Sequence, residues 1–289
     1  MSRVSTITST TLSKGTKTKC DPHSEASLRL VTGERVSLFD WLRIFVGHAC
    51  FCAIGFFGIL IFPALALSNR VREIFFAFIY LIMQRLWYDD YGSVRRVLMT
   101  GLDDIVSHDA TLKASDAVRV LEVGAAYGPN LPYIHRNIEY WRLEPNVSFE
   151  PEFQNNLAAN RKVQLVRTIR GYGEDMYMVP DGHFDAVVLT YVLCTAKDGR
   201  KLLSECKRVL RKGGRLLFAE HVGHPKGTFA RSLQDILAPM VMYFTGGCYM
   251  NRDSGSLLLE AGFTDVRMEN VNLNIPCEYS YHVYGFATV

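Results

Sequence analysis

Short apolar runs that alternate with polar segments constrain the fold of this chain more than any other feature. The first run, VRVLEVG at residues 118–124, indicates a buried strand that ends in glycine. Further runs lie at 139–145, 163–169, 183–193 and 214–222. The run 183–193 is apolar almost throughout, which is typical of a strand buried on both faces. With helical patterns between the runs, the chain predicts a parallel sheet covered by helices on both faces.

The segments around these runs predict where helices and edge strands lie. Residues 198–214 form an amphipathic helical pattern with a basic last turn and a glycine stop. A short helix should follow the first strand, because Pro129 suits a first helical turn and Pro132 limits its continuation. Residues 263–271 and 279–289 follow each other without a long helix. We therefore expect an antiparallel pair at one edge of the parallel sheet.

Charge and cysteine content narrow the class of protein. The net charge is only +3, which gives no indication of a nucleic-acid partner. The seven cysteines include no C-x-x-C pair. We interpret all of them as reduced thiols in a reducing compartment, and we expect neither disulfides nor a zinc site.

The N-terminal region carries a long apolar run. Between Arg43 and Arg70 lie 26 residues without formal charge, and a run of about 20 apolar residues spans a membrane as a helix. A secretory signal would have a shorter apolar core. The second run, 74–83, is too short to span alone and is expected to lie in the membrane interface. Pro63 allows an alternative in which the first run bends into a hairpin.

These patterns divide the chain into four parts. We expect a flexible tail at 1–43, a membrane-anchoring region at 44–90, a linker at 91–115 and an α/β domain at 116–289. The tail begins with residues rich in Ser, Thr and Lys and free of acid, a composition that an organellar transit peptide shares.

The loop after the first strand, LEVGAAYGPN, has the composition of a nucleotide-binding turn. In such sheets a ligand binds at the carboxyl ends of the strands. Gly124 allows a tight turn, and Gly128 lets the next helix begin against the ligand. Glu144 ends the second strand and can accept hydrogen bonds from both hydroxyls of a ribose. Ala126 stands where such loops usually have glycine, and its methyl group can be accommodated if the backbone does not need a positive φ.

Nicotinamide dehydrogenases use a similar loop and a similarly placed acid. Their G-x-G-x-x-G spacing would require glycine where Pro129 stands. Their sheets also usually continue parallel, whereas residues 263–289 predict an antiparallel end. Both features favour another class of nucleotide-binding protein.

Taken in order, several motifs resemble those of class I S-adenosylmethionine-dependent methyltransferases across about residues 115–289. They are ExGxxxG at 122–128, the acid at Glu144, GYGEDM at 171–176, PDGHFDAVV at 180–188 and RVLRKGGRLLFAEHV at 208–222. More narrowly, the chain is similar to the methyltransferase-like protein 7 family. That likeness rests on the apolar N-terminus, LEPN, GED-M, T-x-VLC at 190–194, EHV at 220–222, the pair Gly247-Cys248 and H-x-YG at 282–285.

The resemblance implies a Rossmann-like methyltransferase sheet with an antiparallel C-terminal strand, and it assigns residues to the site. The residues expected to hold S-adenosylmethionine are Glu122, Gly124, Gly128, Glu144, Gly173, Glu174 and Thr190. Tyr191 and His221 are expected beside the transferred methyl group, His221 as a general base that titrates near neutrality. Core packing for Tyr191, a structural role for His221 and a solvated position for Glu174 stay open. Cys194 either lines an acceptor pocket or is a small buried apolar residue.

The implied function is methyl transfer to a small lipophilic acceptor, first of all a thiol, which reacts as the thiolate. The family consists of thiol S-methyltransferases anchored to the endoplasmic reticulum and lipid droplets. We therefore expect membrane lipid as a partner and a catalytic domain that faces the cytosol. The sequence indicates no oligomeric state. Alternatives are methylation of carbon or oxygen in a lipid or isoprenoid, and a silent membrane adaptor that keeps the fold.

Overall fold

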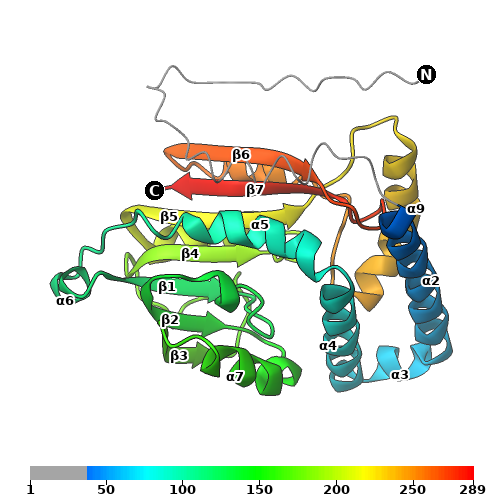
Figure 1. The fold of residues 1–289 in the computed structure, drawn as a ribbon, viewed down its shortest axis with the longest axis horizontal. Coiled ribbons are helices and arrows are strands. Elements are labelled where there is room, and N and C mark those ends of the chain that lie inside the picture. The colour runs from blue at the N-terminus through cyan, green and yellow to red at the C-terminus, as the bar shows by residue number, and fades with distance from the viewer. Residues whose placement is uncertain (1–37) are drawn as a thin grey trace.

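The computed structural model describes residues 38–289 and contains one seven-stranded sheet (Figure 1). Its strands are β1 (Ala117–Val123), β2 (Asn137–Leu143), β3 (Val163–Ile169), β4 (Phe184–Thr190), β5 (Leu210–His221), β6 (Asp265–Asn272) and β7 (Tyr281–Thr288). They lie in the order β3-β2-β1-β4-β5-β7-β6. β1 to β5 pair in parallel, and β7 is antiparallel to both β5 and β6. The predicted fold class, a Rossmann-like sheet with an antiparallel C-terminal strand, is confirmed.

The side chains of the central strands alternate between two buried layers, one on each face of the sheet. Val118 and Val120 face the layer formed by α5 (Tyr88–Thr100), whereas Leu121 and Val123 face that of α8 (Gly199–Val209). The remaining helices around the sheet are α6 (Ala110–Ala114), α7 (Glu150–Ala158), α10 (Ser254–Glu260) and the single 3₁₀ turns η1 (Leu131–Tyr133) and η2 (Val147–Phe149). The predicted short helix after the first strand is therefore the single turn η1.

One predicted helix boundary is wrong. α8 begins at its N-cap Asp198, whose carboxylate accepts a hydrogen bond from the N–H of Lys201. It ends at Val209, before the expected glycine stop, because Leu210 already pairs with Phe184 as the start of β5. Pairing with the neighbouring strand has overridden the helical pattern there.

The apolar N-terminal region folds into three helices at the carboxyl end of the parallel strands (Figure 1). They are α2 (Leu38–Leu60), α3 (Phe62–Leu67) and α4 (Asn69–Leu86), and α9 (Phe229–Phe244) lies beside them. Pro63 lies in the first turn of α3, which joins α2 to α4, so the chain is turned back by the second apolar run in α4 and not by a hairpin within the first run. Among residues 38–289, one helix, Trp41–Leu60, is long and apolar enough to cross a membrane, and little of it is buried.

Two glycines bring α2 close to the rest of the protein. A Cβ at Gly47 would lie 2.2 Å from the ring of Trp87, and one at Gly58 would lie 2.9 Å from the ring of Phe244. Arg43 also forms an ion pair with Asp90 at 2.6 Å. These contacts dock α2 against the domain along much of its length.

The four-part division of the chain stays a prediction. Most of the tail expected at 1–43 lies outside the described residues. The stretch 91–115, expected as a linker, contains most of α5 and all of α6, and α5 contacts β5 and β7.

Candidate active site

A cleft of about 680 Å³ lies at the carboxyl ends of β1, β2 and β4, where the direction of strand order reverses. From the sheet and its loops it is lined by Gly124, Ala126, Glu144, Gly173, Glu174, Thr190 and Tyr191. From the other side it is lined by Arg72, Glu73, Phe76 and Tyr80 of α4 and by Gly246 and Gly247 after α9. Five of the seven predicted cofactor residues thus line one cleft.

Glu144 lies at the end of β2 with its carboxylate fixed by the backbone. One oxygen accepts the N–H of Ala126 and the other accepts the N–H of Asn146, both at 2.8 Å. Burial raises the pKa of Glu144, and the two backbone hydrogen bonds offset part of this rise. Each carboxylate oxygen keeps a second lone pair. The side chain therefore has acceptor capacity left for hydroxyl groups in the cleft.

The loop after β1 adopts left-handed backbone conformations at alternate residues. φ is +68° at Gly124, +45° at Ala126 and +77° at Gly128. The condition under which the methyl group of Ala126 is accommodated freely is therefore not met. Its N–H bonds to Glu144, and its carbonyl accepts a hydrogen bond from Arg142 at 2.9 Å. These two bonds hold a conformation that costs alanine about 1 kcal/mol.

The two other predicted cofactor residues, Glu122 and Gly128, are buried behind the wall of the cleft. The carboxylate of Glu122 accepts hydrogen bonds from Asn130 Nδ2 at 2.8 Å and from the hydroxyl of Tyr140 at 2.6 Å. Asn130 Nδ2 also donates to the hydroxyl of Thr190 at 2.9 Å. Burial raises the pKa of Glu122 to about 6. Glu122 therefore holds the loop after β1 against the end of β4.

Gly173 and Glu174 form one end of the cleft. A Cβ at Gly173 would lie 2.4 Å from Leu202 and 2.7 Å from Val123, so only glycine fits there without a shift. Glu174 accepts a hydrogen bond from the N–H of Lys197 at 2.8 Å, which ties its loop to the one after β4.

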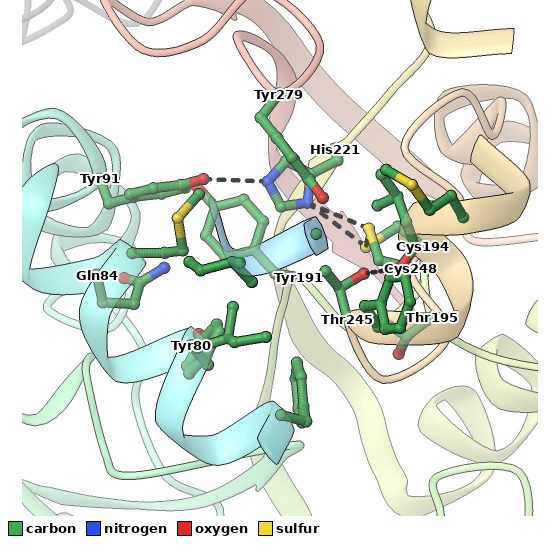
Figure 2. A pocket seen from close by; sticks show the side chains of 18 residues that line it. Tyr80, Gln84, Tyr91, Tyr191, Cys194, Thr195, His221, Thr245, Cys248 and Tyr279 are labelled. Atoms are coloured by element: carbon green, nitrogen blue, oxygen red, sulfur yellow. Dashed lines mark hydrogen bonds between the residues drawn. The ribbon is translucent and has the colours of Figure 1, made fainter. Parts of the chain in front are cut away.

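A smaller, mostly apolar pocket of about 80 Å³ adjoins the cleft, and the two share Phe76, Tyr80, Tyr191 and Thr195 (Figure 2). Its apolar wall comes from Ile54 and Gly55 of α2, Ile79 and Met83 of α4, and Met240, Val241 and Phe244 of α9. Its polar groups belong to Gln84, Tyr91, Cys194, His221, Thr245, Cys248 and Tyr279. The pocket thus joins the N-terminal helices to the ends of β4 and β5.

Tyr191 lines both spaces in a strained conformation. Its φ is +59°, and its N–H donates to the carbonyl of Ala219 at 2.7 Å. The ring lies 4.6 Å from that of His221 and 5.2 Å from that of Tyr91, centre to centre. Strain of this kind at a buried residue is commonly found at functional sites. The structure therefore brings Tyr191 and His221 together, as the sequence predicted.

His221 lies between a tyrosine and two cysteines. Its Nε2 is 3.3 Å from the hydroxyl of Tyr91, and its Nδ1 is 3.7 Å from Cys194 Sγ and 3.9 Å from Cys248 Sγ. Burial lowers the pKa of His221 well below its usual value, and His282 and Arg95 lower it further. Burial therefore favours the neutral form of this imidazole, against the expectation that it titrates near neutrality.

Sequence reasoning missed two buried charged side chains around this pocket. Both carboxylate oxygens of Glu220 accept backbone N–H groups, and these come from Val192, Leu193 and Cys194. Arg95 packs its guanidinium over the rings of Tyr91 and Tyr191, and its Nε and Nη2 have no hydrogen-bond partner within residues 38–289. The helical spacing of Tyr91, Val94, Arg95 and Leu98 was the available signal for Arg95.

Comparisons with known proteins agree with this geometry. A methyltransferase domain family matches residues 121–218. Thiol S-methyltransferase TMT1B of Rattus norvegicus is 32% identical over 199 residues, which cover 69% of this chain and 79% of that protein. Thiol S-methyltransferase TMT1A of Homo sapiens is 30% identical over 203 residues, which cover 70% of this chain and 81% of that protein.

Solved structures share the fold at lower identity. The CurJ carbon methyltransferase superposes with a TM-score of 0.59 at 16% identity and covers 94% of this chain and 72% of its own. A methyltransferase of Thermotoga maritima, described as a possible histamine N-methyltransferase, gives a TM-score of 0.50 at 16% identity. It covers 75% of this chain and 99% of its own. These two likenesses show the fold alone.

Proposed function

Because this chain belongs to the thiol S-methyltransferase family that contains TMT1A and TMT1B, we propose that it methylates a small lipophilic thiol delivered from a membrane. The chain is an S-adenosylmethionine-dependent methyltransferase. The observation that carries the finer proposal is the small apolar pocket. It adjoins the cofactor cleft on one side and is walled on the other by α2, the helix long and apolar enough to cross a membrane.

The cleft has the features that S-adenosylmethionine requires. Its volume suits a nucleoside with an amino-acid tail. Glu144 offers oriented acceptors for the ribose hydroxyls, and Gly171 leaves open space where any other residue would project. In this proposal Gly173 and Glu174 flank the adenine, and Gly124 and Thr190 border the methionine part. The cofactor, when bound, supplies a methyl group activated on a positively charged sulfur.

The protein's own task is to bind the acceptor, align its sulfur and keep water out. Tyr191 belongs to both the cleft and the pocket, so we assign it the alignment of acceptor and donor. A thiol must react as thiolate, and an apolar pocket disfavours that anion. The buried guanidinium of Arg95 over the ring of Tyr191 supports the anion by its charge. In this proposal His221 lies in the wall of the acceptor pocket.

Delivery from a membrane is supported by the exposed apolar side chains of the N-terminal helices. Those on α2 are Leu38, Phe39, Trp41, Leu42, Phe45, Val46, Phe56, Phe57, Ile59 and Leu60, and Phe62 and Leu67 extend the surface over α3. We define this set as the N-terminal apolar face. Exposed large apolar side chains gathered on neighbouring helices are typical of a membrane or protein contact. We extend the proposal to the endoplasmic reticulum or lipid droplets, with the catalytic domain facing the cytosol.

The test is methyl transfer by the full-length protein in detergent. Labelled S-adenosylmethionine is offered with a series of alkyl thiols and with alcohols of matched chain length. We expect labelled thioethers and no labelled ethers, with better use of longer chains. Label on alcohols or isoprenoid carbons alone would contradict a thiol acceptor, and failure to bind the cofactor would favour a silent adaptor.

The variant Glu144→Gln tests the cofactor site through its affinity for S-adenosylmethionine. Loss of a charged acceptor for the ribose should cost about 2 kcal/mol, so the dissociation constant should rise about 30-fold by calorimetry. The matched control is Glu139→Gln, which lies at the opposite end of β2 and pairs with Arg119. If the two variants bind S-adenosylmethionine equally well, Glu144 does not contact the cofactor.

A further inference from the structure

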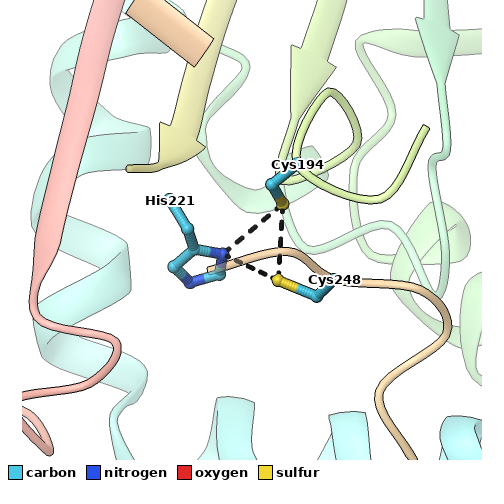
Figure 3. A group of neighbouring side chains, drawn as sticks. All are labelled: Cys194, His221 and Cys248. Atoms are coloured by element: carbon cyan, nitrogen blue, oxygen red, sulfur yellow. Dashed lines mark hydrogen bonds between the residues drawn. The ribbon is translucent and has the colours of Figure 1, made fainter. Parts of the chain in front are cut away.

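Three side chains with metal-binding atoms meet at the wall of the small pocket (Figure 3). Cys194 follows β4, His221 ends β5 and Cys248 follows α9, and all three are buried. The two sulfurs are 3.6 Å apart, and Nδ1 of His221 is 3.7 and 3.9 Å from them. We call these three residues the Cys2His cluster.

The three separations match the edges of a tetrahedral coordination sphere. With a Zn–S bond of about 2.3 Å and a Zn–N bond of about 2.0 Å, tetrahedral angles place two sulfurs about 3.8 Å apart and sulfur about 3.5 Å from nitrogen. The separations in the cluster fall close to both values. A disulfide, in contrast, would require the sulfurs to approach to about 2.0 Å.

The surroundings of the cluster also suit a metal. The hydroxyl of Tyr91 lies 3.3 Å from Nε2 of His221, the ring atom that faces away from the sulfurs. A proton on Nε2, donated to that oxygen, leaves the Nδ1 lone pair directed at the cluster, as in histidines that bind zinc. The backbone N–H of Cys194 is in turn fixed by Glu220 at 3.1 Å. Hydrogen bonds to Tyr91 and Glu220 therefore fix the positions of two of the three proposed ligands, His221 and Cys194.

We propose that Cys194, His221 and Cys248 bind one Zn²⁺ ion whose fourth coordination position faces the small pocket. Three protein ligands and one open position are the pattern of a catalytic zinc site. Resting on the proposed function, we further assign that open position to the sulfur of the acceptor thiol. The S–H bond breaks as the sulfur–zinc bond forms, the electron pair stays on sulfur, and the proton leaves to solvent through the larger cleft. The acceptor is thereby held as a thiolate without a protein base.

The charges around the site agree with this assignment. Two cysteine thiolates neutralise Zn²⁺, and a bound substrate thiolate adds one negative charge. The guanidinium of Arg95 lies 5.6 Å from the centre of the Tyr191 ring, whose centre lies 4.6 Å from that of the His221 ring. Within residues 38–289 no ion pair joins Arg95 to a carboxylate, and its Nε and Nη2 have no hydrogen-bond partner, so its charge is available to balance the substrate.

Metal binding is tested directly on the full-length protein in detergent, under reducing conditions. After treatment with a chelator and dialysis, the protein is titrated with Co²⁺, which reports thiolate ligands by charge-transfer absorption and tetrahedral geometry by its visible bands. We expect one equivalent of Co²⁺ per chain, displaced by Zn²⁺. Cys194→Ala and Cys248→Ala should each lose the charge-transfer band. Tyr91→Phe should bind the metal about 10-fold or more weakly, as expected when the hydrogen-bond partner of a ligand is removed.

The matched control is Cys206→Ala, because Cys206 is equally buried but lies on α8 away from the cluster. It should keep the full cobalt spectrum. S-adenosylmethionine affinity, measured by calorimetry, checks that each variant is folded, and if one cysteine variant fails to fold the other gives the result. The same spectrum in all cysteine variants, or no thiolate band in the wild type, would overturn the zinc site.

The two proposals fail separately. Thiol methylation by wild-type protein that carries no metal and is indifferent to chelators would overturn the zinc site and leave the proposed function intact. Stoichiometric metal binding in a protein that methylates no thiol would keep the zinc site and overturn the thiol acceptor.

Discussion

Ala126 holds a left-handed backbone conformation that glycine adopts without steric cost, at φ +45°. We predict that Ala126→Gly raises the free energy of unfolding by about 1 kcal/mol and leaves cofactor affinity nearly unchanged. Chemical denaturation in detergent and calorimetry measure the two quantities. The matched control is Ala125→Gly, at a buried neighbour without a positive φ, which should lose about 1 kcal/mol. If both variants were less stable than the wild type, the left-handed backbone of Ala126 would not be strained.

Single residues show which features of the site the sequence alone could predict and which it could not. Glu144 was predicted correctly at the end of its strand, because strand length and loop position fix where a terminal side chain lies. The φ of Ala126 was not predictable, because it is decided by hydrogen bonds to Glu144 and Arg142, which are distant in the sequence. Glu122 was expected to face the cofactor, yet Asn130 and Tyr140 draw its side chain behind the loop.

Glu122 also makes stability depend on pH. Burial raises its pKa from 4.5 to about 6 in the folded protein, so the folded state binds a proton more tightly than the unfolded chain. Its contribution to stability is fully present below pH 4.5 and is lost as pH rises through about 6. We predict that Glu122 contributes a fall of about 2 kcal/mol in the free energy of unfolding across this window. Glu122→Gln, followed by denaturation at several pH values, should reduce the total fall by that amount. An unchanged pH profile would assign it to another group.

At the scale of elements, the sequence predicted strands better than helices. The central strands β1 and β4 are almost entirely buried apolar runs, so their positions follow from the sequence pattern, whereas the edge strand β3 is mostly exposed. α5 was expected as part of a linker, because Gly92 and the buried Arg95 interrupt its apolar stripe. No sequence pattern predicted α9, which carries Pro239 in its interior and is apolar on much of its surface. The helices that shape the acceptor pocket are thus those whose packing partners lie far away in the sequence.

The docking of α2 against the domain gives an element-scale prediction. Gly47 lies against the ring of Trp87, whereas a Cβ at Gly55 would meet only Met240, at 3.9 Å. Gly→Ala in a helix gains about 1 kcal/mol from propensity, and overpacking of a tight contact costs about 1–3 kcal/mol. Gly47→Ala should therefore lower the thermal stability and Gly55→Ala should raise it. If α2 were detached from the domain in the native protein, both substitutions would change the melting temperature in the same direction.

At the scale of the whole molecule, the fold class was predictable and the acceptor pocket was not. Strand order follows from the family resemblance, which covers most of the domain. The pocket is built from α2, α4, α9 and the ends of β4 and β5, and no local pattern encodes that meeting. The same holds for the Cys2His cluster, because the search for C-x-x-C pairs could not detect two cysteines 54 positions apart. Function in this chain depends on contacts that only the tertiary structure creates.

The N-terminal apolar face links membrane binding to the choice of acceptor. Phe45 and Phe56 are exposed on α2, so neither supports the domain core. Burying a phenylalanine side chain in lipid contributes about 2 kcal/mol. The double variant Phe45→Asp, Phe56→Asp should therefore bind neutral lipid vesicles at least about 100-fold more weakly in flotation.

The matched control is Tyr177→Asp, since Tyr177 is a similarly exposed aromatic residue in the loop between β3 and β4, outside the N-terminal helices. It should bind vesicles as the wild type does. Cofactor affinity should be equal in all three proteins, because none of the substituted residues lines the cleft. With vesicles present, KM should rise in the double variant for long-chain thiols, which partition into lipid, and stay constant for short water-soluble thiols. A uniform change across chain lengths would show that α2 shapes the pocket itself and does not deliver the acceptor from the membrane.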